Sequence, residues 1–320
     1  MKKILLIIFL SFLISFSMFL VLIQTFYQEQ EIALIENEQN YYSSIQEIDH
    51  KIFLVGGSHI SAINPFFIEE FLGENNEEYE VFNLSKMANR PLREIKNIDL
   101  LISAKPEIVV YGISARDFAK IQSINTPVVT SNLPLPDPSL FFKDWLNVQN
   151  SELLILQPDF SPKLITLKEI RGITVNSQDY IKAPFFRFDY KRDFNVMSDK
   201  ELKLQAVGDA KPVEIEPIDK SKDLSSLKII ITKLQENNIK VILFTTPQHK
   251  YFYDLVATSE KQAFEKIILD LEKSNNLDVY RFTEKYSDLE IWRNPTHIVV
   301  SKSASIFSDD VANLILEELK

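Results

Sequence analysis

Two short stretches at opposite ends of the chain carry side chains suited to be a nucleophile and its base. Ser58 follows two adjacent glycines in FLVGGSHI (residues 53–60), and His297 stands three residues after Asn294 in WRNPTHIVV (292–300). A serine hydroxyl becomes a strong nucleophile when a histidine accepts its proton, and a third group must orient that histidine. Ser58, His297 and Asn294 are therefore candidates for acyl-transfer chemistry.

Each candidate also has an ordinary structural interpretation. A serine that begins a helix commonly caps it, and a lone loop histidine often has no chemical role. A phosphate-binding loop is not indicated at Gly56-Gly57-Ser58, because the G-x-G-x-x-G spacing and the P-loop lysine are both missing. For His59 we favour a place on the first helical turn with no role in the site, since consecutive helix residues point in different directions.

The elements that must position these residues follow from the alternation of apolar runs. Short apolar runs predict strands, and segments with apolar residues at helical spacing separate them. The strands are expected at 51–55, 79–85, 107–112, 240–246 and 277–282. The helices are expected at 64–72, 91–104, 223–238, 259–274 and 301–319. This alternation predicts an α/β fold with a parallel sheet. Ligands of such sheets bind beyond the carboxyl ends of the strands. We therefore expect Ser58, after the first strand, to meet His297, in a loop before the last helix.

Taken together, these features resemble the SGNH (GDSL-type) hydrolase family over about residues 50–112 and 223–320. Four blocks carry the resemblance: Gly56-Gly57-Ser58, the stretch FNLSKMAN at 82–89, Gly112-Ile113-Ser114, and Asn294-Pro295-Thr296-His297. The sequence departs from the family pattern at Gly57 (family aspartate), Ala88 (family glycine), Ser114 (family asparagine) and Asn294 (family aspartate).

The resemblance implies a three-layer, flavodoxin-like parallel sheet and a serine-based acyl transfer. Ser58 would be the nucleophile, His297 its base and Asn294 the support of that base. The oxyanion and substrate-binding groups would come from Gly57, the backbone N–H of Ser58 and Ala88, and the Ser114 hydroxyl. No cofactor is implied.

Asn294 is the most serious departure, because an amide has no charge to stabilise an imidazolium and can favour the wrong tautomer. The corresponding change in a serine protease costs about 10⁴ in rate. Asp288 or Asp117 are alternative supports. Two interpretations follow: an esterase or O-acyltransferase, and a catalytically inactive protein that binds or assembles a cell-envelope polymer. A solute-binding protein is a weaker third, because it needs two similar lobes and only one run of strands is evident.

The N-terminus predicts a membrane anchor. Lys2 and Lys3 precede a charge-free run at residues 4–23, about the length that spans a bilayer as a helix. A cleaved signal peptide is the alternative, but no small-x-small site follows the run. We expect a transmembrane signal-anchor at 1–27, a stalk at 28–49 and the catalytic-type domain at 50–320, with an irregular insertion at about 120–222. The N-terminus would be cytoplasmic and the domain extracytoplasmic.

Composition excludes several classes of function. The chain has 320 residues, a net charge of −10, no cysteine and only four histidines. The negative charge argues against nucleic acid as a partner, and the missing cysteines exclude thiolate chemistry, disulfides and Cys-based metal sites. No metal site is expected. The partners we expect are the lipid bilayer through residues 4–23, an ester substrate for which a cell-surface glycan is a candidate, and a membrane acyltransferase.

Overall fold

The computed structural model describes residues 15–16, 38–120, 182–185 and 195–320. The chain divides into two compact units, residues 1–44 with 122–173 and residues 45–121 with 174–320. Most of the first unit lies outside the described residues, so the elements below belong to the second.

The predicted membrane span at residues 4–23 lies outside the described residues, apart from residues 15 and 16. Among the helices that are described, none combines the length and the apolar character needed to cross a bilayer.

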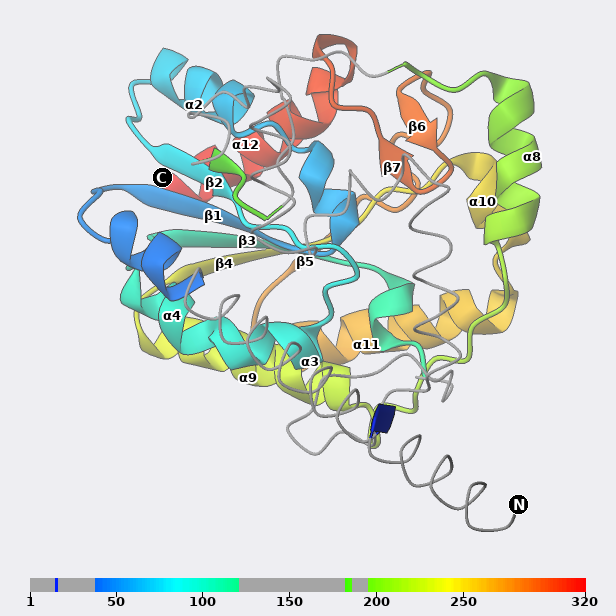
Figure 1. Cartoon of the computed structure of the whole chain (residues 1–320), viewed down its shortest axis with the longest axis horizontal. Coiled ribbons are helices and arrows are strands. Elements are labelled where there is room, and N and C mark those ends of the chain that lie inside the picture. Colours follow the sequence, from blue (N-terminus) through cyan, green and yellow to red (C-terminus); the bar gives the residue numbers. More distant parts are fainter. Residues whose placement is uncertain (1–14, 17–37, 121–181, 186–194) are drawn as a thin grey trace, which may run out of the picture. The chain divides into compact units, whose positions relative to one another are not determined.

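A parallel sheet forms the centre of the second unit (Figure 1). Its described strands run in the order β2-β1-β3-β4-β5 and comprise β1 (Lys51–Gly56), β2 (Glu80–Asn83), β3 (Ile108–Ile113), β4 (Lys240–Thr245) and β5 (Val279–Arg281). Strands β1 and β3 are buried along their whole length, which explains their nearly continuous apolar sequences. The predicted α/β fold with a parallel sheet is confirmed, and this strand order is consistent with a flavodoxin-like fold.

Helices cover both faces of this sheet (Figure 1). On one face, α2 (Pro65–Glu74) packs against α12 (Ser305–Leu319). The other face carries α3 (Pro91–Glu94), α4 (Ile98–Ser103), α9 (Lys222–Glu236) and α11 (Thr258–Asn275). Short 3-10 helices are η1 (Ser58–Ala62), η2 (Ile95–Asn97), η3 (Ala115–Phe118) and η5 (Lys302–Ala304).

The stretch 120–222, expected to be irregular, ends in a regular helix. Helix α8 (Asp199–Asp209) packs against α10 (Lys250–Leu255). It begins with a capping box, in which Ser198 and Glu201 each bond the other's backbone N–H. That S-x-x-E signal marks the helix start in the sequence. Residues 121–181 and 186–194 of the expected insertion lie outside the described residues.

A small antiparallel hairpin of β6 (Trp292–Asn294) and β7 (His297–Ile298) precedes the last helix. His297 was expected in a loop, and it instead begins β7, paired with Asn294. The turn between the two strands is only Pro295-Thr296, which explains why the segment reads as a loop in the sequence.

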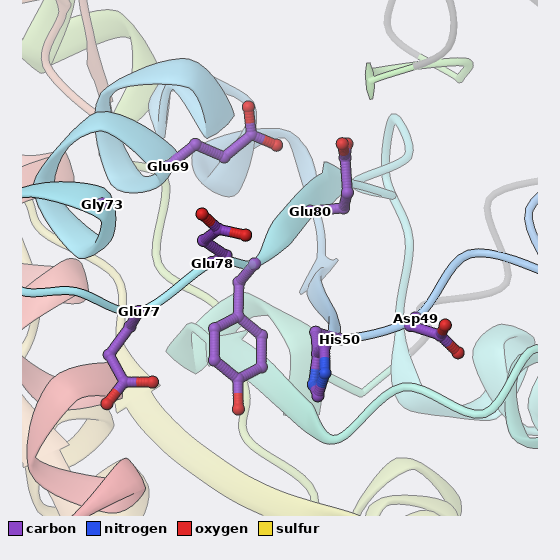
Figure 2. A pocket seen from close by; sticks show the side chains of 8 residues that line it. Asp49, His50, Glu69, Gly73, Glu77, Glu78 and Glu80 are labelled. Atoms are coloured by element: carbon purple, nitrogen blue, oxygen red, sulfur yellow. The ribbon is translucent and has the colours of Figure 1, made fainter.

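The amino ends of β1 and β2 border an acidic pocket of about 400 Å³ (Figure 2). It is lined by Asp49, His50, Glu69, Gly73, Glu77, Glu78, Tyr79 and Glu80. Lys182 pairs with Glu69 and Glu80 at this pocket. The pocket lies at the opposite end of the strands from Ser58, which follows the carboxyl end of β1.

Candidate active site

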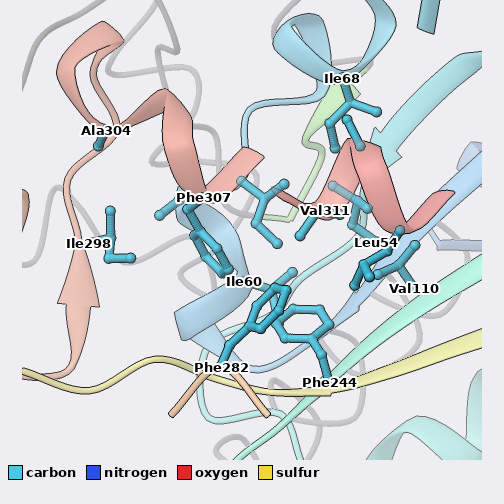
Figure 3. Close-up of a cluster of buried hydrophobic side chains, with 14 of the residues drawn as sticks. Leu54, Ile60, Ile68, Val110, Phe244, Phe282, Ile298, Ala304, Phe307 and Val311 are labelled. Carbon is cyan, nitrogen blue, oxygen red and sulfur yellow. The ribbon is translucent and has the colours of Figure 1, made fainter. Parts of the chain in front are cut away.

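The turn after β1 has its shape because of how Ile60 packs. Gly56 has a φ of 144°, and a Cβ there would lie 2.7 Å from the carbonyl oxygen of Gly112 and 2.8 Å from Cγ1 of Ile60. Ile60 is fully buried and packs among core aromatic side chains such as Phe244 and Phe282 (Figure 3). Gly56 therefore lets the chain turn sharply, and Ile60 holds the start of η1 and Ser58 down against the carboxyl end of β1.

His249, the residue that caps the start of α10, contacts the hairpin that carries His297. Trp292 is fully buried, and the ring of His249 meets it edge-on at 5.6 Å. The His249 backbone N–H donates to the carbonyl of Pro295 at 3.0 Å, inside the turn itself. The side chain of His249 caps α10 by accepting the N–H of Tyr251 at 3.2 Å. This histidine thus supports the hairpin and is itself buried.

Ser58, His297 and Asn294 form one hydrogen-bonded chain. Nε2 of His297 lies 2.9 Å from Oγ of Ser58, although 239 residues separate them in sequence. Nδ1 of the same ring lies 3.0 Å from Oδ1 of Asn294. A distance of 2.9 Å is within the range that direct proton transfer from a hydroxyl to a base requires.

The hydrogen bonds of Asn294 determine the tautomer of His297. The backbone N–H of Thr296, which can only donate, lies 3.0 Å from Oδ1 of Asn294. The amide oxygen must therefore face the turn, and the same oxygen faces Nδ1 of His297. Nδ1 then carries the proton, and Nε2 presents its lone pair to Ser58. The Asn294 side chain thus selects the tautomer that a base requires.

The surroundings of His297 disfavour its charged form. Burial is the main cause that lowers its pKa to about 4, and the positive charges of Arg293 and Arg116 act in the same direction. No carboxylate pairs with His297 among the residues that the structure describes. His297 is consequently neutral at physiological pH and ready to accept a proton, but the imidazolium it would form has no anionic partner from the protein.

His59 lies directly against His297, although the sequence favoured no role for it in the site. The two rings stack with centroids 4.5 Å apart and planes 14° apart. Burial, followed by the charge of His297, holds the pKa of His59 well below its ordinary value. Ser58 and His59 are the first two residues of a 3-10 helix, and the ring of His297 lies over this first turn, so both side chains reach the same ring.

Two of the expected oxyanion groups lie close to the turn of Ser58. A Cβ on Gly57 would meet the carbonyl oxygen of Asn89 at 3.4 Å, so the loop after β2 runs beside this turn. Ala88, in that loop, has a left-handed φ of 49°, a conformation typical of glycine. Within the described part of the chain, the backbone N–H groups of Ser58 and Ala88 donate to no other residue. Both amides are thus available to a ligand.

The third expected oxyanion residue, Ser114, is buried at the start of η3. Its backbone N–H donates to Oδ2 of Asp117 at 2.6 Å, and its hydroxyl has no hydrogen-bond partner among the described residues. The structure does not bring it into the hydrogen-bonded chain of Ser58. Burial raises the pKa of Asp117 to about 7 against the hydrogen bonds from Ser114.

Neither alternative carboxylate reaches His297. Asp117 binds Ser114, and Asp288 pairs with Lys250 at 2.9 Å. Arg116 does not pair with Asp117; its guanidinium donates to the carbonyl of Asp209 and lies over the ring of Phe252. Among the described residues, no group of histidines and carboxylates is arranged to hold a metal ion.

Comparisons with known proteins add little to this picture. No family model matches the sequence, and no curated protein is similar to it. The crystal structure of TesA superposes with a TM-score of 0.42 at 10% sequence identity, over 82% of this chain and 96% of that one. A similarity at this level carries no information about function.

Proposed function

We propose that this protein is an SGNH-like serine esterase or O-acyltransferase. One observation carries the proposal: Oγ of Ser58, the ring of His297 and Oδ1 of Asn294 form a continuous chain of hydrogen bonds at 2.9 and 3.0 Å. A serine that merely capped a helix would not need a histidine oriented in this way.

Acyl transfer by Ser58 requires the His297 tautomer in which Nε2 carries no proton. Nε2 of His297 takes the hydroxyl proton of Ser58 while Oγ attacks the carbonyl carbon of an ester, and a tetrahedral intermediate forms. The intermediate collapses to an acyl-serine, and the alcohol leaves with the proton held by Nε2. Water or an acceptor hydroxyl then gives its proton to Nε2 and attacks the acyl-serine. Hydrolysis or acyl transfer results, and free Ser58 is restored.

The negative oxygen of the tetrahedral intermediate needs hydrogen-bond donors. The backbone N–H groups of Ser58 and Ala88 are available for this purpose. The loss of one good donor typically costs about 10²–10³ in rate. The Ser114 hydroxyl is shorter and less fixed than the asparagine amide of the family pattern, so we expect the two backbone donors to carry most of this role and the enzyme to be slow.

Labelling with a fluorophosphonate tests the proposal. The probe forms a bond between Oγ of an activated serine and phosphorus, and fluoride leaves. We expect labelling of the full-length protein, none in Ser58→Ala and strongly reduced labelling in His297→Gln. Ser303→Ala is the matched control, since Ser303 is exposed and, among the described residues, its hydroxyl bonds that of Ser301. A folded wild-type protein that is not labelled, or that is labelled equally in Ser58→Ala, would contradict the proposal.

An inactive binding protein is the second candidate, and a specific observation favours it. No carboxylate supports His297 among the described residues, and the positive charges of Arg116 and Arg293 disfavour the imidazolium that catalysis requires. The same experiment separates the two functions, because an inactive protein that retains the fold is not labelled at Ser58.

We further propose that the protein is anchored in a membrane and acts on an ester of a cell-surface glycan, with a membrane acyltransferase as partner. What supports the anchor is the charge-free run at 4–23 behind Lys2 and Lys3. Membrane fractionation of the full chain and of a variant that lacks residues 1–27 tests the anchor. Recovery of the full chain in the soluble fraction would contradict it.

A further inference from the structure

Among the described residues, His59 is the ring that stacks on the proposed base, His297. The ring centroids lie 4.5 Å apart and the planes are almost parallel. His59 comes from η1 and His297 from β7, so two separate elements bring the rings together. Within the described part of the chain, the side chain of His59 makes no hydrogen bond, and this stack is its specific contact.

The charges that face His297 leave its protonated form poorly supported. Arg116 of η3 and Arg293 of β6 are both exposed cations, and His59 of η1 is the third titratable group nearby. Asn294 supplies only a neutral oxygen. The hydroxyl oxygen of Thr296, 3.0 Å from Nδ1, is likewise neutral. When Ser58 gives up its proton, the described contacts of the positive charge on His297 are these neutral oxygens and the ring of His59 over its face.

A neutral aromatic ring attracts a cation placed over its face. We propose that His59 is a positioning residue, whose ring face fixes the plane of His297 and supports its charged form while Ser58 attacks. This inference rests on the proposed function. The proton moves only from Oγ of Ser58 to Nε2 of His297, and His59 gains and loses none.

His59 can act in this way because it stays neutral when its neighbour becomes charged. Burial, and then the charge of His297 itself, lowers the pKa of His59 well below its ordinary value. Two protonated rings at this distance would repel each other. A proton that Ser58 delivers to His297 therefore disfavours a second proton on His59.

Two substitutions of His59 distinguish an effect of its aromatic face from an effect of apolar packing alone. His59→Phe keeps an aromatic face and removes the ring nitrogens, whereas His59→Leu keeps an apolar side chain and removes the face. We expect Phe to retain activity within about threefold and Leu to lower kcat about tenfold with little change in KM. If both variants have the same kcat, or if Phe is as impaired as Leu, the proposal is overturned.

The pKa of His297, followed by NMR of labelled histidine, gives a readout that needs no substrate. Phe and Leu are both apolar and carry no titratable group, and Phe alone keeps the aromatic face. We expect a higher pKa for His297 in the Phe variant than in the Leu variant. Equal pKa values of His297 in the two variants would overturn the role of His59, whether or not Ser58 reacts with the probe. If Ser58 is labelled and the two pKa values are equal, the proposed function stands and only the role of His59 fails.

A double-mutant cycle with Asn294→Asp completes the test. A carboxylate at position 294 would support the imidazolium directly, so the stack would matter less. We expect the loss caused by His59→Leu to shrink from about tenfold to about twofold in the Asn294→Asp background. An equal loss in both backgrounds would mean that His59 acts through packing alone, against the proposal.

Discussion

The amide oxygen of Asn294 lies 3.0 Å from Nδ1 of His297, at the distance of a normal hydrogen bond. The same oxygen accepts the backbone N–H of Thr296, and this bond prevents the amide from presenting its nitrogen to the ring. Asn294 therefore performs one of the two tasks of a catalytic aspartate: it sets the tautomer and supplies no charge.

The first prediction concerns that missing charge. Asn294→Asp keeps the acceptor for both Thr296 and His297 and adds a negative charge beside the ring. We expect the pKa of His297 to rise above about 4 and the rate of fluorophosphonate labelling at Ser58 to increase about 10- to 100-fold. Asn294→Ala, which removes the acceptor, is the comparison. If the Asp and Ala variants react at the same rate, Asn294 has no role in orienting the base.

The positions of Ser58 and His297 were accessible from the sequence because they depend on topology. Continuous apolar runs such as Lys51–Gly56 and Ile108–Ile113 predict buried parallel strands, and polar groups after such strands meet at one edge. A loop histidine just before the last helix can reach the same edge. Both residues needed only the order of the elements, which the alternation of apolar runs supplies.

The contacts that set the orientation and the tautomer of His297 could not be predicted from the sequence, because they depend on local backbone geometry. The stack of His59 arises from the tight 3-10 turn at Ser58, and the tautomer arises from the two-residue turn at Pro295-Thr296. Apolar periodicity reports neither kind of turn. The oxyanion role of the Ser114 hydroxyl stays a prediction: Asp117, three residues later, binds the backbone N–H of Ser114, while the hydroxyl has no hydrogen-bond partner among the described residues.

The second prediction concerns the pH dependence of the reaction. The base must be neutral to accept the Ser58 proton, and burial lowers the pKa of His297 to about 4. We expect kcat/KM to be constant down to about pH 5 and to fall about tenfold per pH unit below about pH 4. A pH profile of the labelling rate measures this. An acid limb near pH 6.5, the ordinary value for histidine, would show that the ring is more hydrated or better paired than the site indicates.

The third prediction concerns stability and Asp117. Burial raises the pKa of this carboxyl group from 3.8 to about 7. Between these values the folded protein holds a proton that the unfolded chain has lost, so the free energy of unfolding falls as the pH rises from about 4 to about 7. Asp117→Asn keeps an acceptor for the Ser114 N–H and cannot ionise. Relative to wild type, we expect it to gain stability on the order of 3 kcal/mol between pH 4 and pH 8.

Urea unfolding at the two pH values measures that difference. Asp99→Asn is the matched control, because Asp99 is an exposed carboxylate 2.7 Å from Lys233, and such surface pairs contribute little. The interpretation of Asp117 is wrong if Asp117→Asn and the control show the same pH dependence as wild type.

The last prediction tests how the core fixes the position of Ser58. A Cβ added to Gly112 would lie 1.9 Å from Cδ1 of Ile60, so Gly112→Ala must displace the side chain that holds the start of η1. We expect Gly112→Ala to lower the free energy of unfolding by about 1–3 kcal/mol and to slow labelling of Ser58, because the turn moves away from His297. Gly73→Ala is the control, since a Cβ there meets no atom within 4 Å and a helical alanine is favoured over glycine.

Removal of Cδ1 should relieve the clash. Ile60→Val alone costs about 0.5–1.5 kcal/mol in a buried core, but in the Gly112→Ala background we expect it to restore stability and labelling in part. The two substitutions would then be strongly non-additive, as residues in direct contact are. Strictly additive losses would mean that the turn of Ser58 is held by contacts other than the packing of Ile60 over Gly112, and that the position of the nucleophile does not depend on this part of the core.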